Sequence, residues 1–180
     1  DLQRQIPYSE LLRVVKALSQ GLSDAGIRAG DVIAVQLPNC AEQPIVHLAA
    51  NRIGAIAMPI HDAWYEAELP HLLGASHAVA AIVPTRYKDV DYPGIYASLR
   101  GQLPHLKQVF AIGQVSAHAD SYDALLAHDG DSPFPSVDPD ALAALMLSSG
   151  TTSMPKISGF SSNNVLALLA PFWRRIRLTS

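Results

Sequence analysis

Apolar residues recur along this chain with two alternating spacings, one typical of helices and one typical of buried strands. Near the start, four apolar residues follow the stripe of an amphipathic helix, at Leu11, Val15, Leu18 and Leu22. Ser9 is placed to cap the start of this helix, and Gly26 is placed where a left-handed residue ends it. The stretch 9–26 is therefore predicted to be a helix with one buried face.

Short apolar runs separate the helical stretches and predict strands that are covered on both faces. In 32–37 every residue is apolar except Gln36, so neither side of this strand is left for solvent. Further strands are expected at 55–60, 78–83, 108–112 and 141–147, and further helices at 41–52, 66–73, 93–101, 121–126 and 162–170. Pro70 falls in the first turn of its helix, where it is tolerated, and Gly74 is expected to end that helix.

Strands that alternate with helices predict an α/β fold. The expected architecture is a three-layer αβα domain with a mostly parallel sheet and helices on both faces. Ligands bind such sheets outside the carboxyl ends of the strands. The segment 129–140 is rich in Asp, Ser and Pro, a composition typical of a surface connection.

The composition narrows the class of protein. With 180 residues, 49% of them apolar and 16% charged, the chain is long and apolar enough for one globular domain. A net charge of −3 gives no basic surface for nucleic acid. No apolar run approaches the roughly 18 residues of a membrane span, and no signal peptide opens the chain. The single cysteine, Cys40, has no partner for an internal disulfide, which favours a cytoplasmic location.

Other side chains with catalytic potential show no recognisable spacing. The seven histidines match neither of the zinc-binding patterns H-x-x-x-H and H-E-x-x-H, so we infer no metal site from them. No G-x-S-x-G turn is present to start a Ser-His-Asp hydrolase. Tyr87, Tyr92 and Tyr96 are expected to cluster in a partly buried loop.

The stretch 147–156 carries the clearest chemical signal. Its sequence is Leu-Ser-Ser-Gly-Thr-Thr-Ser-Met-Pro-Lys, so backbone N–H groups and hydroxyls crowd one short loop that Lys156 closes. The apolar run 141–147 leads into this loop, as a buried strand does. Many donors and one fixed cation at the end of a strand predict a binding site for phosphate.

The P-loop of nucleoside triphosphatases, G-x-x-x-x-G-K-[ST], has the same spacing from Gly150 to Lys156 but differs at two positions. Pro155 stands at the second glycine of that motif, and Ile157 replaces the Ser or Thr that follows the lysine. Proline has no N–H to donate to a phosphate, so we reject the P-loop interpretation. Pro155 also disfavours an unrelated phosphate-binding domain such as a kinase.

The loop instead resembles the phosphate-binding signature of adenylate-forming enzymes, Ser/Thr-Ser-Gly-Thr-Thr-Gly-x-Pro-Lys-Gly. This family contains acyl-CoA synthetases, luciferases and the adenylation domains of peptide synthetases. The chain matches the signature at Ser148, Ser149, Gly150, Thr151, Thr152, Pro155 and Lys156. It departs at Ser153 and Ile157, where the family has glycines. Segments 8–11, 30–39 and 48–60 are also similar to the family in the expected order, so the resemblance spans nearly the whole chain.

The resemblance implies that the chain is the N-terminal portion of an acyl-CoA synthetase-like ligase. Such an enzyme joins a small carboxylic acid to ATP in the presence of Mg²⁺, releases pyrophosphate and passes the acyl group to coenzyme A. By the resemblance, Lys156 meets the terminal phosphates of ATP, and hydroxyl and amide donors of the loop meet the β- and γ-phosphates. These donors belong to Ser148, Ser149, Gly150, Thr151 and Thr152. The remaining family machinery lies downstream and has no counterpart here, so no catalytic residue is assigned.

Two interpretations of the chain stay open. It is either a fragment of a ligase that is inactive by itself, or a degenerate homologue that binds a nucleotide or a partner without catalysis. The two lost glycines favour the second, because a β-branched Ile157 at positive φ is strained, whereas Ser153 tolerates such a backbone with modest strain. The reading frame beyond codon 180 separates the two interpretations.

We expect one truncated domain over 1–180. Strands and helices alternate over 9–128, a linker follows at 129–140, the strand and phosphate loop occupy 141–157, and a trailing helix occupies 158–180. A truncated domain exposes apolar surface that normally packs on its missing half. A homo-oligomer is therefore expected in solution.

Overall fold

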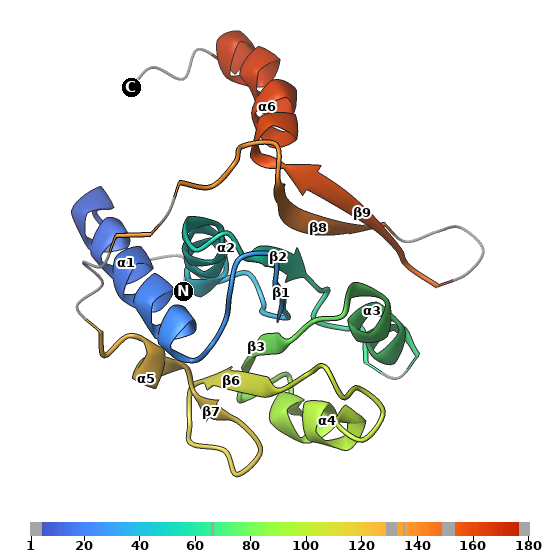
Figure 1. Ribbon diagram of the computed structural model, residues 1–180. Coiled ribbons are helices and arrows are strands. Elements are labelled where there is room, and N and C mark those ends of the chain that lie inside the picture. Colours follow the sequence, from blue (N-terminus) through green and yellow to red (C-terminus); the bar gives the residue numbers. More distant parts are fainter. Residues whose placement is uncertain (1–4, 66, 129–132, 135, 149–153, 177–180) are drawn as a thin grey trace.

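A seven-stranded sheet runs through the computed structural model, which describes residues 5–65, 67–128, 133–134, 136–148 and 154–176 (Figure 1). The helices are α1 (Tyr8–Asp24), α2 (Glu42–Arg52), α3 (Glu68–Ser76), α4 (Tyr92–Leu99), α5 (Tyr122–Leu125) and α6 (Ser162–Ile176). The strands are β1 (Val32–Val35), β2 (Ile56–Pro59), β3 (Ala80–Pro84), β4 (Arg86–Tyr87), β5 (Val90–Asp91), β6 (Gln108–Ile112), β7 (Asp120–Ser121), β8 (Leu142–Ser148) and β9 (Lys156–Ser161).

The sheet is mostly parallel, as the alternation of strands and helices predicts. Its strand order is β7-β6-β3-β1-β2-β8-β9, and every neighbouring pair is parallel except β8 and β9. The short strands β4 and β5 form a separate hairpin. Because the carboxyl ends of the parallel strands share one edge of the sheet, the segments that follow β1 and β2 lie there beside the end of β8.

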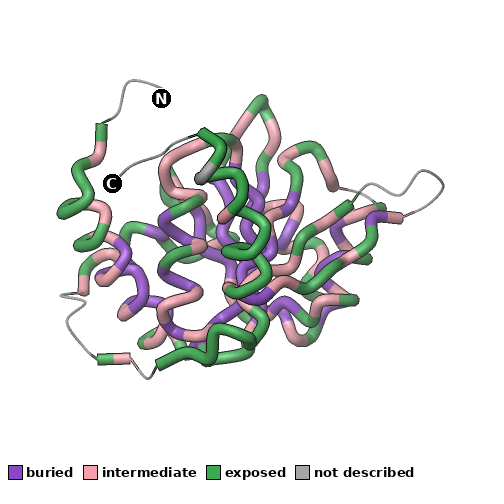
Figure 2. Tube along the Cα trace, turned by 90° about the horizontal axis from the view of Figure 1, so that it is seen from above, coloured by how far each residue is buried: buried purple, intermediate pink, exposed green. Residues whose placement is uncertain are grey.

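Helices cover both faces of the sheet, which confirms the three-layer α/β prediction. Apolar residues of α1, α2 and α5 form one core cluster, and those of α3 and α4 form the other. β1 contributes to both clusters, since Ile33 and Val35 face the first and Val32 and Ala34 face the second. Figure 2 shows the buried residues gathered in the middle of the fold, with exposed residues around its rim.

The predicted helices are present, but several of their ends differ from the prediction. α1 begins after Pro7, and the Ser9 side chain does not cap it, because Ser9 lies inside the first turn. Gly26 does adopt the predicted left-handed backbone, with φ of 95°. α3 passes through Gly74 and ends instead at His77, which takes the left-handed conformation with φ of 52°.

The prediction for the C-terminal part of the chain needs three corrections. The strand after the phosphate loop, β9, was missed, because 158–161 is too small and polar to show a strand pattern and its partner is the neighbouring strand β8. β8 is only partly buried, since Leu142 and Met146 are about half exposed. α6 extends to Ile176, beyond the predicted end at 170, and stands clear of the other helices (Figure 1).

The prediction that Tyr87, Tyr92 and Tyr96 cluster in a partly buried loop is also wrong. Tyr92 and Tyr96 belong to α4 and are almost completely buried in the core, whereas Tyr87 belongs to β4. Asp91 accepts a hydrogen bond from the backbone of Gly94 and so caps the start of α4. No helix within the described ranges is long and apolar enough to cross a membrane.

Gly21 and Gly74 both lie inside helices, but their surroundings differ. A methyl group at Gly21 falls on the backbone of Leu125 in α5, whereas one at Gly74 meets only the Leu103 side chain at 3.7 Å. We expect Gly21→Ala to lower the free energy of unfolding in urea by about 1–3 kcal/mol, because overpacking outweighs the gain in helix propensity. Gly74→Ala, the matched control, is expected to raise it by about 0.5–1 kcal/mol. A stabilised Gly21→Ala variant would contradict the close packing of α1 on α5.

Candidate functional site

The two ends of the predicted phosphate loop lie side by side at the edge of the sheet. β8 ends at Ser148 and β9 begins at Lys156, and these two residues are direct partners in the antiparallel hairpin. Since β8 runs parallel to β2, Ser148 lies at the carboxyl end of a parallel strand, where ligands bind in sheets of this kind. The role of the other predicted donors stays a prediction. These donors lie outside the described residues and are Ser149, Gly150, Thr151 and Thr152.

Lys156 is exposed at the start of β9. Within the part of the chain that the structure describes, no carboxylate forms an ion pair with it. Its ammonium group is therefore left for another anion. The chemistry of this end of the hairpin fits the predicted contact with phosphate, because a lysine binds phosphate as a point charge.

The expected strain at Ile157 is absent. Ile157 pairs with Leu147 in the β8–β9 hairpin and packs against the core cluster under α3 and α4. It is not among the described residues that have positive φ. A β-branched side chain suits such a strand, so replacing the family's glycine here costs no backbone strain. The other lost glycine, at Ser153, lies outside the described residues.

A cleft of about 700 Å³ opens beside the start of the phosphate loop. It lies at the carboxyl ends of three parallel strands, with Asn39 following β1, Ile60 following β2 and Leu147 in β8. Trp64 and Tyr87 add aromatic surface to its wall. Sequence reasoning did not assign this cleft, because its walls come from segments far apart along the chain.

The loop 61–64, which forms one wall of this cleft, is fixed by a buried polar network. The Gln36 side chain is completely buried, and its Nε2 donates to the carbonyl oxygens of His61, at 3.0 Å, and Trp64, at 2.8 Å. Its Oε1 accepts from the Tyr96 hydroxyl at 3.0 Å. Gln36, the single polar residue in the apolar run 32–37, therefore indicates a buried hydrogen-bond network, but the sequence does not predict which residues are its partners.

A third hydrogen bond to the same loop comes from α4. The Tyr92 hydroxyl donates to the carbonyl oxygen of Asp62 at 2.8 Å. Burial raises the pKa of both Tyr92 and Tyr96. Both hydroxyls therefore stay protonated and able to donate at neutral pH.

The β4–β5 hairpin adds Tyr87 and the turn residue Lys88 to the lining of the cleft. Lys88 and Asp89 form its tight turn with φ of 48° and 63°, a conformation that non-glycine residues rarely take. The Lys88 ammonium lies 3.3 Å from the Asp62 carboxylate, and the hydrogen bond to this carboxylate, together with its negative charge, raises the pKa of Lys88. Because Lys88 is exposed, this pair is screened by solvent and adds little to stability. It does place one cation and one anion at the mouth of the cleft.

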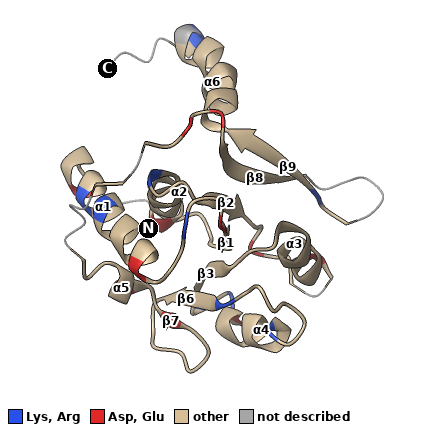
Figure 3. Ribbon diagram, in the orientation of Figure 1, with Lys and Arg blue, Asp and Glu red and all other residues tan. Residues whose placement is uncertain are grey.

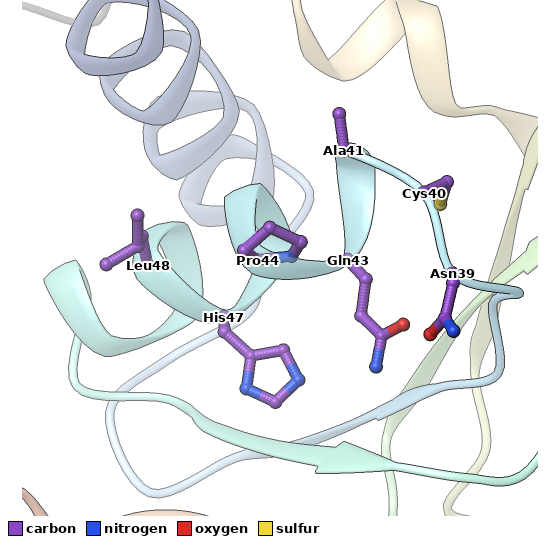
Figure 4. Close-up of a pocket in the computed structure, with 7 residues that line it drawn as sticks. All are labelled: Asn39, Cys40, Ala41, Gln43, Pro44, His47 and Leu48. Atoms are coloured by element: carbon purple, nitrogen blue, oxygen red, sulfur yellow. The ribbon is translucent and has the colours of Figure 1, made fainter. Parts of the chain in front are cut away.

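A shallower cavity of about 760 Å³ lies along the start of α2 (Figure 4). The side chains of Asn39, Gln43 and His47 point to the same side of this segment (Figure 4). Burial lowers the pKa of His47 and raises the pKa of the Cys40 thiol. Both groups are therefore neutral at pH 7, and a protonated thiol is a weak nucleophile. This cavity carries no sign of catalysis.

The described residues do not gather into a metal centre. No group of three or more His, Cys, Asp or Glu side chains within them is placed to hold a metal ion. The closest imidazole pair, His77 and His105, has ring centroids 5.1 Å apart, and His105 bonds to the carbonyl oxygen of Leu73. His77 caps the end of α3 and His105 lies between α4 and β6, and the described residues add no carboxylate or thiolate ligands to this pair.

The family model for the AMP-binding enzyme matches residues 1–179 of the chain. The chain belongs to this family. The match covers both the α/β fold and the β8–β9 hairpin, so it confirms the resemblance stated from the loop sequence.

Curated relatives of this chain include ligases. The medium-chain fatty-acid–CoA ligase of Escherichia coli (strain K12) is 31% identical over 175 residues, which are 96% of this chain and 31% of that protein. The salicyl-AMP ligase / salicyl-S-ArCP synthetase of Mycobacterium tuberculosis (strain ATCC 25618 / H37Rv) is 32% identical over 153 residues, covering 84% of this chain and 27% of that protein. The chain thus spans about a third of the length of these relatives.

Solved structures share the architecture. The apo structure of Mycobacterium smegmatis MbtA superposes with a TM-score of 0.87 at 30% identity, over 98% of this chain and 33% of that chain. A putative long-chain-fatty-acid CoA ligase of Rhodopseudomonas palustris CGA009 gives a TM-score of 0.84 at 24% identity, over 98% and 43% of the two chains. At 24% identity, the similarity to the Rhodopseudomonas palustris structure shows the fold alone.

Tyr96→Phe tests the buried network that fixes the loop 61–64. The substitution leaves the Oε1 of Gln36 buried without its donor. We expect the free energy of unfolding in urea to fall by about 1–3 kcal/mol, the cost of an unpaired buried polar group. Tyr8→Phe is the matched control, because Tyr8 is 89% exposed, and it should change stability by less than about 0.5 kcal/mol. Equal effects of the two variants would refute the network.

The same tyrosines predict how stability depends on pH. The pKa of Tyr92 and that of Tyr96 both lie above the unfolded value of 10.0, so the folded chain holds these protons more tightly. Their stabilisation is complete below about pH 10 and is lost as the pH rises above it, because the unfolded chain then releases its protons first. Urea unfolding followed by circular dichroism between about pH 8 and pH 11 should show this loss. The loss should be smaller in Tyr96→Phe, and an identical pH profile for the variant would contradict the assignment.

Proposed function

We propose that this chain forms the phosphate-binding part of an ATP-dependent, acyl-CoA synthetase-like ligase. The observation that carries the proposal is the β8–β9 hairpin, which sets Ser148 and Lys156 opposite each other at the carboxyl end of a parallel strand. The residues between them have the family's phosphate signature up to Thr152. The names of the relatives, which are acyl-CoA and aryl-AMP ligases, support the same chemistry.

In the proposed reaction a carboxylate oxygen of the acid attacks the α-phosphorus of ATP. The new bond joins the acid to AMP, the bond from the α-phosphorus to its bridging oxygen breaks, and pyrophosphate leaves with the bonding electrons. The thiol of coenzyme A then attacks the acyl carbon, loses its proton and displaces AMP. The substrates are thus a small carboxylic acid, ATP and coenzyme A.

The chemical difficulty is charge, because an anionic acid must approach an anionic phosphate. Fixed cations and N–H donors stabilise the charge that develops on the phosphate oxygens and on the leaving pyrophosphate. In this proposal Lys156 binds the terminal phosphates, and the hydroxyl of Ser148 donates to the phosphates together with the loop that follows it. Mg²⁺ supplies further neutralisation in such reactions, but the described residues offer no ligand cluster that fits it.

The second candidate is a degenerate homologue that binds a nucleotide or a partner without catalysis. Ser153, in place of a glycine, favours it. Ile157 no longer does, because it fits a strand without positive φ.

We further propose that 1–180 is one truncated domain with a linker at 129–140, that the protein is cytoplasmic, and that it forms a homo-oligomer.

The phosphate contact predicts how the 180-residue chain binds nucleotide. We expect Mg-ATP to bind no more tightly than about the millimolar range, because a few donors facing solvent gain little once the entropy of association is counted. Lys156→Ala should abolish the binding that remains, since it removes the cation. Lys107→Ala is the matched control, because Lys107 is also an exposed lysine but precedes β6. Isothermal calorimetry measures the dissociation constant of Mg-ATP for the unmodified chain, for Lys156→Ala and for Lys107→Ala.

A second assay separates inactivity from loss of binding. We expect no ATP–pyrophosphate exchange by the chain alone with fatty or aromatic acids. Exchange with any of these acids would show that the chain is active by itself and would refute the non-catalytic alternative. Binding that survives Lys156→Ala but fails in Lys107→Ala would refute the assigned phosphate site.

A further inference from the structure

We propose that His61 is a pH-dependent switch at the mouth of the cleft, which exchanges its hydrogen-bond partner when it gains a proton and then binds an oxyanion together with Lys88. The two partners are the backbone N–H of Ala63 and the carboxylate of Asp62. The inference rests on the geometry of the loop 61–64 and not on the phosphate loop. It can therefore fail or hold separately from the proposed ligase function.

One ring nitrogen of His61 lies within reach of both a donor and an acceptor. Its Nδ1 is 3.1 Å from the backbone nitrogen of Ala63, which donates to it, and 3.2 Å from Oδ1 of Asp62. The two contacts need opposite states of Nδ1, because an imidazole nitrogen accepts without a proton and donates with one. Only one of them is therefore a hydrogen bond at any moment.

The proton on Nδ1 decides which hydrogen bond forms. Neutral His61 with its proton on Nε2 accepts from the Ala63 N–H. Protonated His61 has an N–H on both nitrogens, so Nδ1 donates to Asp62 and the bond from Ala63 is lost. Ala63 is exposed, so water takes up its free N–H group. An imidazole ordinarily changes its charge near about pH 6.5, which puts the exchange close to neutral pH.

The backbone of the loop does not have to move in this exchange. Gln36 donates to the carbonyl oxygens of His61 and Trp64. The Tyr92 hydroxyl donates to the carbonyl oxygen of Asp62. Both of these side chains belong to the buried interior, whereas the His61 side chain is 63% exposed and can take a proton from solvent. The change is therefore confined to the ring, the carboxylate and one amide.

The charge at the mouth of the cleft depends on the same proton. Asp62 uses Oδ1 toward His61 and Oδ2 toward the ammonium of Lys88, at 3.3 Å. With neutral His61 the charges of Asp62 and Lys88 cancel. With protonated His61 one positive charge remains, and two cations share a single carboxylate. Both cations are then able to attract an oxyanion such as a phosphate group.

The other walls of the cleft do not oppose this change. Among the described residues that line it, Asp62 and Lys88 are the charged ones. The remaining lining residues are neutral and include Asn39, Gln43, Trp64, Tyr87, Met146 and Leu147. Lys, Arg, Asp and Glu residues are spread over many elements of the fold rather than gathered at one place (Figure 3). One added charge therefore changes the local potential at the cleft appreciably.

Sulfate is a suitable probe for this site, because it stays doubly charged over the pH range in which an imidazole titrates. We expect sulfate to bind the chain at least about threefold more tightly at about pH 5.5 than at about pH 7.5, because one added cation attracts the dianion. The NMR shifts of the amides of 61–64, followed at constant ionic strength, give the dissociation constant at each pH. His61→Gln should remove this pH dependence. His118→Gln is the matched control and should retain it, because His118 is exposed between β6 and β7.

Lys156→Ala separates this site from the phosphate loop. The substitution should leave the pH dependence of sulfate binding at the loop 61–64 unchanged, since Lys156 does not take part in the exchange. Loss of the pH dependence in Lys156→Ala would place the sulfate at the phosphate loop and overturn the inference. Circular dichroism checks that all variants are folded.

An NMR titration of the unmodified chain without sulfate tests the exchange itself. We expect the amide proton of Ala63 to shift upfield with the same midpoint as the ring protons of His61, because the amide loses its acceptor when the ring is protonated. An Ala63 amide that does not follow the ring would overturn the inference. The same pH dependence of sulfate binding in the unmodified chain and in His61→Gln would also overturn it.

Discussion

Burial of the central strands on both faces is the constraint on which the rest of this structure depends. Ile33, Ala34 and Val35 of β1 are completely buried, although successive side chains point to opposite faces. Both faces of the sheet must then be covered, and parallel strands require crossover helices that supply the cover. The same crossovers bring the carboxyl ends of β1, β2 and β8 to one edge. The placement of Ser148 and Lys156, the two ends of the predicted phosphate loop, therefore follows from hydrophobic burial and strand pairing.

Gln36, which follows β1, is the one polar residue in the buried run 32–37, and its side chain has a specific role. Gln36 is as buried as its neighbours, and burying an amide is unfavourable unless each of its groups is paired. Here both are paired, because its amide nitrogen donates to the loop 61–64 and its oxygen accepts from Tyr96. The amide therefore fixes a surface loop to the interior of the sheet. That loop forms a wall of the cleft beside the phosphate loop, so the polar network and the candidate site are parts of one arrangement.

The two-sided burial that defines the centre of the sheet fails at its β9 edge. β8 is only partly buried, several apolar residues of α6 are exposed, and β9 is the last strand of the sheet, paired with β8 alone. This edge also holds Ser148 and Lys156, the two described ends of the phosphate loop. Whatever covers the edge therefore also bounds the space in which a triphosphate is proposed to bind.

The sequence by itself determined the elements whose signal is local. The stripe of α1, the left-handed Gly26 and the bounds of β6 all follow from spacing and residue type. The phosphate chemistry of the loop that Lys156 closes stays a prediction from the same kind of signal. Only the tertiary structure decided what depends on distant partners. β9 forms because β8 lies beside it, Ile157 escapes strain because that pairing keeps its backbone extended, and the cleft exists because separate strands end at one edge. Local periodicity records which face of an element is apolar, but hydrogen bonds between strands and side-chain networks arise only when the chain brings distant residues together.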